Sequence, residues 1–250
     1  GIADWGIIAA GTALVTALSY VNTIRWSIWF DEAFSNYITK FNFIEIAKYT
    51  ASDVHPPLYY YVLKLWCAVA GNSAVALRSL SLLWLIIAMI VAYIFVKKHF
   101  GRVAAAVTFA LLALSPMLLR YSSEARMYTM SVCIMVLATV VLVWATRYPS
   151  RKKWVLYGAL IALGVLTHYL TLLVWVAHWC WRYLLIRQAK SSVKFKDFLT
   201  GDWILAHIAA LIVGMLWLPM MVWQVIHIQG GGFWIAPISL DTLPNFVANL

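Results

Sequence analysis

Hydrophobic residues in this chain fall into long runs, and the polar residues gather between them. Seven such runs cover residues 5–20, 79–96, 103–119, 127–146, 154–167, 169–186 and 203–222. An apolar helix of about 20 residues crosses the hydrocarbon core of a bilayer, which is about 30 Å thick. The pattern therefore predicts an all-α integral membrane protein with about seven transmembrane helices.

The composition supports this class. Apolar residues make up 64% of the chain and charged residues only 11%, whereas soluble domains are about 45–50% apolar and about 25% charged. Cys67, Cys133 and Cys180 stand apart in apolar surroundings, without a CxxC pair or a neighbouring His, so no disulfide framework or zinc site is predicted. No cofactor is predicted, and a divalent metal is left open.

Charges separate the connecting segments into two groups. One group holds twelve Lys and Arg residues against three acids, and the other holds seven against six acids, Asp241 included. The positive-inside rule assigns the basic group to the cytoplasm and the mixed group to the extracytoplasmic side. The net charge of +10 is thus explained by topology, and we expect no nucleic acid partner.

The apolar segment 57–70 is excluded from the spans by this charge pattern. If it crossed the membrane, every later loop would lie on the side opposite to the one its charge predicts. We therefore predict a first extracytoplasmic loop over residues 21–78, in which segments 33–40, 43–50 and 57–70 form helices lying in the membrane interface. The aromatic residues and Lys64 of the last segment suit that position.

The residues able to do chemistry all belong to the mixed-charge side. They are Asp31 and Glu32, His55, Glu124 and Arg126, and His168. Charged residues at membrane depth cost about 2.5–3.5 kcal/mol each, and those that persist usually serve function. Each also has a purely structural interpretation: the acids could favour a helix dipole, His55 could be an interfacial loop residue, and His168 a packing residue.

Arg126 fits a structural role less well. It is predicted in the first turn of a helix, where a cation opposes the helix dipole, so the position favours an anion from outside the helix. A phosphate held by Arg126 at the helix N-terminus would satisfy both groups. We accordingly predict a phosphate site at Arg126, to which His55 and His168, on the same side of the membrane, can contribute.

Three motifs together resemble a known family. They are Trp-Phe-Asp-Glu-Ala from Trp29, His-Pro-Pro-Leu-Tyr from His55, and Tyr-Ser-Ser-Glu-Ala-Arg-Met-Tyr from Tyr121 to Tyr128. In this spaced combination the chain resembles the GT-C membrane glycosyltransferases of the protein O-mannosyltransferase and lipid A aminoarabinose transferase superfamily. The resemblance covers roughly residues 5–237.

The resemblance implies transfer of a sugar from a polyprenyl-phosphate donor to a lipid, glycan or protein acceptor, on the extracytoplasmic side of a bacterial or archaeal plasma membrane. Asp31 matches the catalytic acid of the first loop and Glu124 the acidic position of the second. His55 takes a position at which relatives carry a basic residue near the phosphate. Relatives continue into further spans and often a soluble domain, so residues 1–250 are expected to form one catalytic module without the acceptor-recognition half.

The residue chemistry supports the same reaction. Sugar transfer needs a base for the acceptor hydroxyl, cations for the departing phosphate and an apolar groove for the lipid tail. We predict Asp31 as the base, with Glu32 and Glu124 as the further catalytic acids, and inversion by a single displacement. Aromatic residues are expected to line the groove: Trp29, Tyr59, Tyr121 and Tyr128.

Two other functions are compatible with the sequence. A transporter or flippase of lipid-linked sugars would place ionisable residues or broken helices near the bilayer midplane. The centres of the predicted spans are almost free of charge, and His207 and Pro219 are only weak indications. A non-catalytic lipid-binding subunit is the second alternative, and an assay of glycan transfer distinguishes it from an enzyme.

Overall fold

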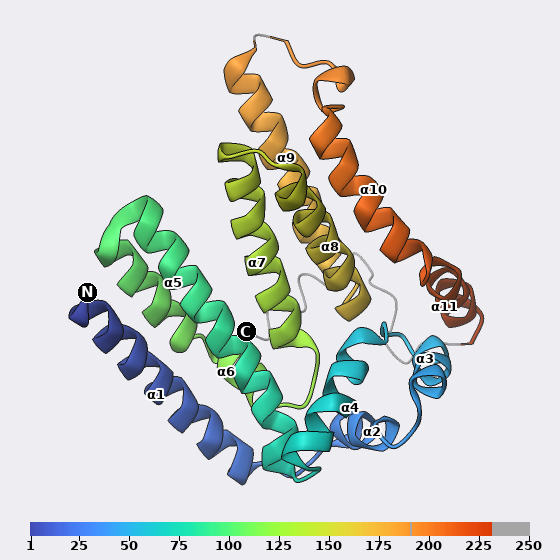
Figure 1. The fold of residues 1–250 in the computed structure, drawn as a ribbon. Helices are drawn as coiled ribbons and strands as arrows, with labels where there is room; N and C mark the ends of the chain where they lie inside the picture. Colours follow the sequence, from blue (N-terminus) through green and yellow to red (C-terminus); the bar gives the residue numbers. More distant parts are fainter. Residues whose placement is uncertain (191, 232–250) are drawn as a thin grey trace, which may run out of the picture.

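The protein is described here by a computed structural model, which describes residues 1–190 and 192–231; Asp241 lies outside them. This part of the chain is helical and contains no strand, as predicted. The helices are α1 (Ile2–Arg25), α2 (Phe30–Ile38), α3 (Phe43–Ala51), α4 (Leu58–Ala70), α5 (Ala74–Ala113), α6 (Pro116–Ser122), α7 (Tyr128–Arg147), α8 (Arg151–Thr167), α9 (Thr171–Ala189), α10 (Gly201–Met215) and α11 (Leu218–Gly231), with a short 3-10 helix, η1 (Phe195–Asp197), before α10 (Figure 1).

Helix α5 is two arms joined at a sharp bend. Gly101 has φ 90° and ψ 173°, which is not helical and which residues with a Cβ rarely adopt. The chain turns back at this point, and the two arms run side by side (Figure 1). Two of the predicted runs, 79–96 and 103–119, therefore fall largely within α5, and the second ends early because Pro116 begins the separate helix α6.

The buried apolar residues form two clusters. The smaller one joins α1 to both arms of α5 through Val15, Met89 and Phe109. The larger one joins α2, α3 and α4 to α7, α8 and α10. In it, Gly158 allows close approach of α8 and α10, since a Cβ at this position would lie 2.1 Å from the Ala206 carbonyl oxygen. The helices of the outer loop are thus packed onto the ends of the longer helices.

The number of membrane spans is only partly settled. Within the described residues, α1, α5 and α7 are long and apolar enough to cross a membrane, and α10 with α11 adds a fourth candidate if the bent pair is one span. Helices α8, of 17 residues, and α9, of 19 residues, are not in this set. The chain is therefore an all-helical protein with membrane-spanning helices, and the count of seven stays a prediction.

The run predicted over residues 203–222 is interrupted. Helix α10 ends at Met215, α11 begins at Leu218, and the two are bent by 60°. Pro219 explains the break, because it has no N–H to donate to the carbonyl of the preceding turn and its ring clashes there. The early turns of a new helix tolerate a proline, so α11 can start beside it.

The three helices predicted in the first outer loop are present as α2, α3 and α4. Asn42 begins α3 by accepting the Glu45 N–H at 2.9 Å, and the Glu45 carboxylate accepts the Asn42 N–H at 3.0 Å. Helix α4 has 13 residues, which span about 20 Å at 1.5 Å per residue and cannot cross a bilayer core. All three gather at one end of the longer helices, beside α11 (Figure 1).

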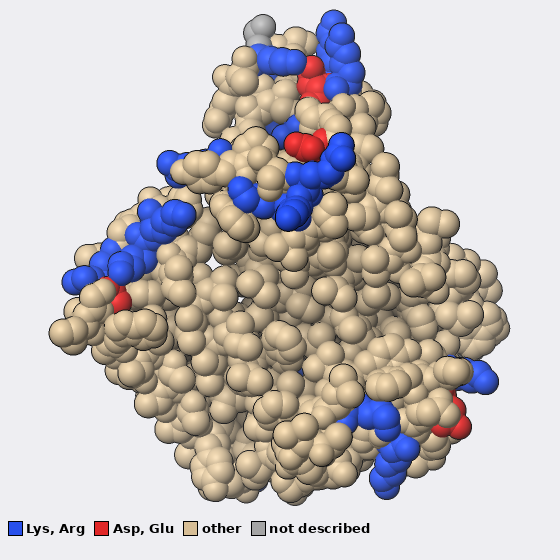
Figure 2. Space-filling model, viewed as in Figure 1, with Lys and Arg blue, Asp and Glu red and all other residues tan. Residues whose placement is uncertain are grey.

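Most of the visible cations lie at the opposite end. In the view of Figure 2, Lys and Arg crowd the turn of α5 and the loops that join α7 to α8 and α9 to α10, above a wide surface with almost no charge. A smaller group of both signs lies at the end that carries α2, α3 and α4. This distribution agrees with the charge pattern that predicted the topology.

The topology predicts the side from which introduced cysteines react. In a Cys180→Ser background, Lys48→Cys and Asn72→Cys should both label with a membrane-impermeant maleimide added from outside, and Lys152→Cys only after the membrane is opened. All three positions are exposed, and the two other native cysteines are buried. Labelling of positions 48 and 72 from opposite sides would show that α4 crosses the membrane.

Candidate active site

The end of the molecule that carries α2, α3 and α4 is centred on a buried ion pair between α2 and α5. Glu32 is 0% exposed and Arg78 is 2% exposed. The Arg78 Nε donates to Glu32 Oε1 at 2.8 Å, and its Nη2 donates to Oε2 at 2.6 Å. This two-pronged arrangement matches the planar guanidinium to the carboxylate and is stronger than a single contact.

Arg78 uses its remaining donors to hold the end of α1. Its Nη1 donates to the carbonyl oxygens of Thr23 and Trp26, at 2.7 and 2.8 Å, and its Nη2 donates to that of Ser27 at 3.1 Å. With the two bonds to Glu32, Arg78 donates five hydrogen bonds, which is the number of N–H groups on a guanidinium. Arg78 is therefore fully satisfied by the protein, and its role is structural.

Glu32 also fixes the loop between α6 and α7. Its Oε1 accepts the Ala125 N–H at 2.8 Å. Ser81 of α5 supports the same loop by donating to the Glu124 carbonyl oxygen at 2.6 Å and, more weakly, to that of Arg126 at 3.3 Å. The side chains of this loop are thus positioned by buried groups from α2 and α5.

Arg126 is held in the loop but is not saturated. It is 3% exposed, and its Nη2 lies 3.4 Å from both Asp31 Oδ2 and His55 Nε2. Its Nε finds no hydrogen-bond partner among the residues that the structure describes. Contacts of 3.4 Å are long for charged groups, so Arg126, unlike Arg78, keeps capacity for an anion.

His55 is oriented from its other side by Asp53. Asp53 Oδ2 lies 3.1 Å from His55 Nδ1. Burial is the largest single influence and acts to raise the pKa of Asp53, but the hydrogen bonds to His55 and the Val54 backbone, together with the charges of His55 and Arg126, hold that pKa below its ordinary value. If Nδ1 carries the proton toward this carboxylate, Nε2 is the acceptor that faces Arg126.

His168, in the turn between α8 and α9, completes the cluster of rings. Its ring lies 6.0 Å from that of His55 and 5.7 Å from that of Tyr128, centroid to centroid. Burial, helped by the charges near His55 and Arg126, lowers the pKa of His168 to about 4. His168 Nδ1 accepts the Leu170 N–H at 3.2 Å, so the proton of the neutral ring lies on Nε2, which can donate.

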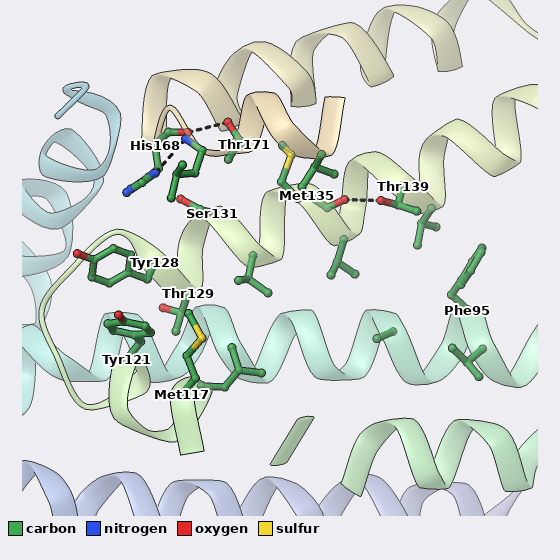
Figure 3. A pocket seen from close by; sticks show the side chains of 18 residues that line it. Phe95, Met117, Tyr121, Tyr128, Thr129, Ser131, Met135, Thr139, His168 and Thr171 are labelled. Carbon is green, nitrogen blue, oxygen red and sulfur yellow. Dashed lines mark hydrogen bonds between the residues drawn. The ribbon is translucent and has the colours of Figure 1, made fainter. Parts of the chain in front are cut away.

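An apolar cavity of about 580 Å³ extends inward from these rings. Tyr121 and Tyr128, whose ring centroids are 4.2 Å apart, lie with His168 at one end, and Phe95 lies at the other (Figure 3). The walls between them are mostly aliphatic residues of α5 and α7, such as Val136 and Val140. The cavity thus has a polar end beside Arg126 and a long apolar part.

A second cavity, of about 520 Å³, lies on the other side of the loop and is polar. Its walls come from the end of α1, the start of α2, α5, α6 and the loop between α6 and α7. The loop separates the two cavities, because Glu124 lines the polar one and Tyr128, four residues later, lines the apolar one. The polar cavity is lined by Trp26, Trp29, Glu32, Arg78, Arg120 and Glu124, among others.

The structure brings most of the predicted site residues to one place. Asp31, His55, Arg126, Tyr128 and His168 form one connected cluster, and the Tyr121 ring packs against that of Tyr128. Glu124 and Trp29 line the polar cavity, where Glu124 pairs with Arg120 at 3.1 Å. Tyr59 is 0% exposed and packs against Tyr60, and the buried Glu32 is engaged by Arg78 and the Ala125 N–H.

Two positioning residues were missed in the sequence, Arg78 and Gln224. Gln224 is 2% exposed and donates to the carbonyl oxygens of Thr50 and Asp53, both at 2.7 Å, while it accepts from the Tyr169 hydroxyl. A lone polar residue within an apolar run was the available signal in both cases. Among the described residues, no group of three or more His, Cys, Asp or Glu side chains is arranged to hold a metal ion.

The helical fold and the cluster of acids, cations and aromatic residues beside an apolar cavity are consistent with a membrane glycosyltransferase of the GT-C class. The family model described as dolichyl-phosphate-mannose-protein mannosyltransferase matches residues 54–223, and the chain belongs to this family. The match includes His55, Glu124, Arg126 and His168, and does not include Asp31. Comparison with curated proteins and with solved structures gave no match.

The buried pair predicts a large loss of stability when one partner is removed. Arg78→Met leaves the Glu32 carboxylate buried without its partner and should cost about 3–5 kcal/mol. The matched control is Arg120→Met, because the Arg120 side chain is 74% exposed in its pair with Glu124 and such pairs contribute only about 0–1 kcal/mol. Thermal unfolding of the two variants in detergent gives the comparison, and equal midpoints would contradict a structural role for Arg78.

Proposed function

We propose that this protein transfers a sugar from a polyprenyl-phosphate donor to an acceptor hydroxyl on the extracytoplasmic side of the membrane. The observation that carries the proposal is the unsaturated Arg126, whose guanidinium carbon lies 6.0 Å from the ring centroid of Tyr128, a residue that lines the apolar cavity. Membership of the family supports a lipid-phosphate donor and a glycan or protein acceptor in general.

The donor lipid occupies the apolar cavity. Its isoprenoid tail lies against the aliphatic walls formed by α5 and α7, and its phosphate reaches the end marked by Tyr121, Tyr128 and His168. Burial of a tail contributes roughly 25 cal/mol for each Å² of apolar surface removed from water. The tail of a lipid in the bilayer is already out of water, so its burial in the cavity contributes less free energy. The phosphate contacts therefore supply most of the specificity.

Arg126 binds the phosphate, and neutral His168 donates to it through Nε2. The unpartnered Nε of Arg126 supports this role, since a buried donor without an acceptor costs free energy that a ligand oxygen can recover. His55 contacts Arg126 itself, so it acts mainly by orienting the guanidinium. The incoming phosphate competes with Asp31 for Arg126 and frees the Asp31 carboxylate.

Asp31 then acts as the general base. Its side chain is 32% exposed, whereas that of the neighbouring Glu32 is 1% exposed, so only Asp31 can meet an acceptor. Asp31 takes the acceptor proton, the acceptor oxygen forms a bond to the anomeric carbon, and the bond from that carbon to the phosphate oxygen breaks. The products are the glycosylated acceptor, polyprenyl phosphate and protonated Asp31, with inversion at the anomeric carbon.

Membrane side and span number are part of the proposal. The site lies at the end opposite to the crowded cations of Figure 2, which supports an extracytoplasmic position with seven spans. A flippase would instead need a polar path through the centre of the bundle. The apolar walls of the cavity beside α7 do not supply one.

Arg126→Ala should weaken binding of the donor lipid about tenfold to a hundredfold, because a charge-assisted contact contributes about 1.5–3 kcal/mol. Arg126→Lys should recover only part of it, since an ammonium lacks the planar pair of donors. Binding of polyprenyl phosphate to the purified protein measures both. Arg120→Ala, in the neighbouring exposed pair, is the control and should bind normally; normal binding by Arg126→Ala would remove Arg126 from the site.

Asp31→Asn should lose about 10²–10⁴ in turnover while it still binds the donor, because Asn keeps the shape but takes no proton. The control is Glu45→Gln in the same outer loop, which preserves the α3 capping box and should transfer at the normal rate. Transfer is measured with saturating donor and acceptor. Near-normal transfer by Asp31→Asn would move the role of base to Glu124.

A further inference from the structure

The polar cavity has a distinctive set of side chains. Carboxylates and guanidiniums line it as two pairs, Glu32 with Arg78 and Glu124 with Arg120. The paired groups leave no net charge on its walls. A cavity of this kind gives no advantage to an anionic or a cationic ligand, and its Glu124–Arg120 pair offers acceptors and donors side by side.

Sugar hydroxyls suit these pairs. Each hydroxyl has one donor and two acceptor sites, so neighbouring hydroxyls can donate to Glu124 and accept from Arg120. Of the two pairs, this one is the more accessible, with side chains 15% and 74% exposed. Asn22, which also lines the cavity, shares no side-chain hydrogen bond with the residues that the structure describes, so its amide can serve a further hydroxyl.

Two tryptophans supply the apolar surface that a sugar needs. Trp26 is 71% and Trp29 45% exposed, and both line the cavity. The C–H face of a pyranose is apolar with a slight positive charge, and the face of an indole is negative, so the two attract each other. Trp29 stands two residues before Asp31, which brings a sugar stacked there close to the general base.

An extended peptide suits the same cavity less well. Peptides are commonly held by main-chain hydrogen bonds to unpaired backbone groups. At this wall the carbonyl oxygens of Thr23, Trp26 and Ser27 are already occupied by Arg78. What remains is indole faces and side-chain polar groups, which favour a sugar.

We propose that the polar cavity is the acceptor site and that the acceptor is a neutral glycan. Calling the cavity an acceptor site rests on the proposed function. Binding of a neutral sugar to the cavity, however, requires neither donor nor turnover. The two ideas can therefore fail separately.

The test is binding of sugars to the purified full chain without donor, measured by saturation-transfer NMR. The probes are mannotriose, cellotriose and chitotriose, with a peptide that carries Ser and Thr as the comparison. At least one trisaccharide should bind and the peptide should not compete with it. Trp29→Ala should weaken that binding about tenfold, and Trp29→Phe, which keeps an aromatic face, should weaken it less.

Trp5→Ala is the matched control, because Trp5 is 72% exposed at the other end of α1 and should not affect binding. The assay contains no donor and measures no transfer, which separates this result from any loss of turnover. Absence of binding by all three trisaccharides, displacement by the peptide, or normal binding by Trp29→Ala would overturn the proposal. Failure of donor binding or of transfer would count against the proposed function alone.

Discussion

The Glu32–Arg78 ion pair holds together the end of the protein that carries α2, α3 and α4. It is nearly inaccessible to water and connects the end of α1, the start of α2, α5 and the loop before α7. Burying two charges is expensive unless every donor and acceptor is satisfied, and Arg78 meets that condition with five hydrogen bonds. Because Asp31 is attached to Glu32 and Arg126 follows Ala125, the pair sets where Asp31 and Arg126 stand relative to each other.

Arg78 and Arg126 are both buried beside acids, but they differ in how fully their N–H groups are used. Every N–H of the Arg78 guanidinium donates to a protein acceptor, while Arg126 has long contacts and an unpartnered Nε. The difference follows from what surrounds each of them: Arg78 meets the free carbonyls at the end of α1, and Arg126 meets two side chains that are themselves engaged or partly exposed. The hydrogen bonds therefore distinguish Arg78, whose N–H groups are all used by the protein, from Arg126, the residue proposed to bind the donor phosphate.

The apolar runs predicted the helical class, and the charge pattern predicted that residues 57–70 stay at one end, where α4 now lies. The motifs also predicted that Asp31, His55 and Arg126 belong to one site, and Arg126 contacts both of the others in the structure. The sequence could not separate the roles of Asp31 and Glu32, because adjacent residues on a helix point in different directions and only the fold decides which is buried. Nor could it reveal Arg78 and Gln224, whose partners lie 46 and 174 residues away.

The loop between α6 and α7 lies between the apolar cavity and the polar cavity and carries Arg126. It is short, so Glu124 and Tyr128 must face cavities on its two sides while Arg126 stays buried between them. In the proposed reaction, the lipid phosphate enters from the apolar side and the acceptor hydroxyl from the polar side, so the two do not share a binding surface. Direct displacement needs attacking and leaving oxygens on opposite faces of the anomeric carbon, and the proposed use of two cavities separated by one anchored loop follows from that requirement.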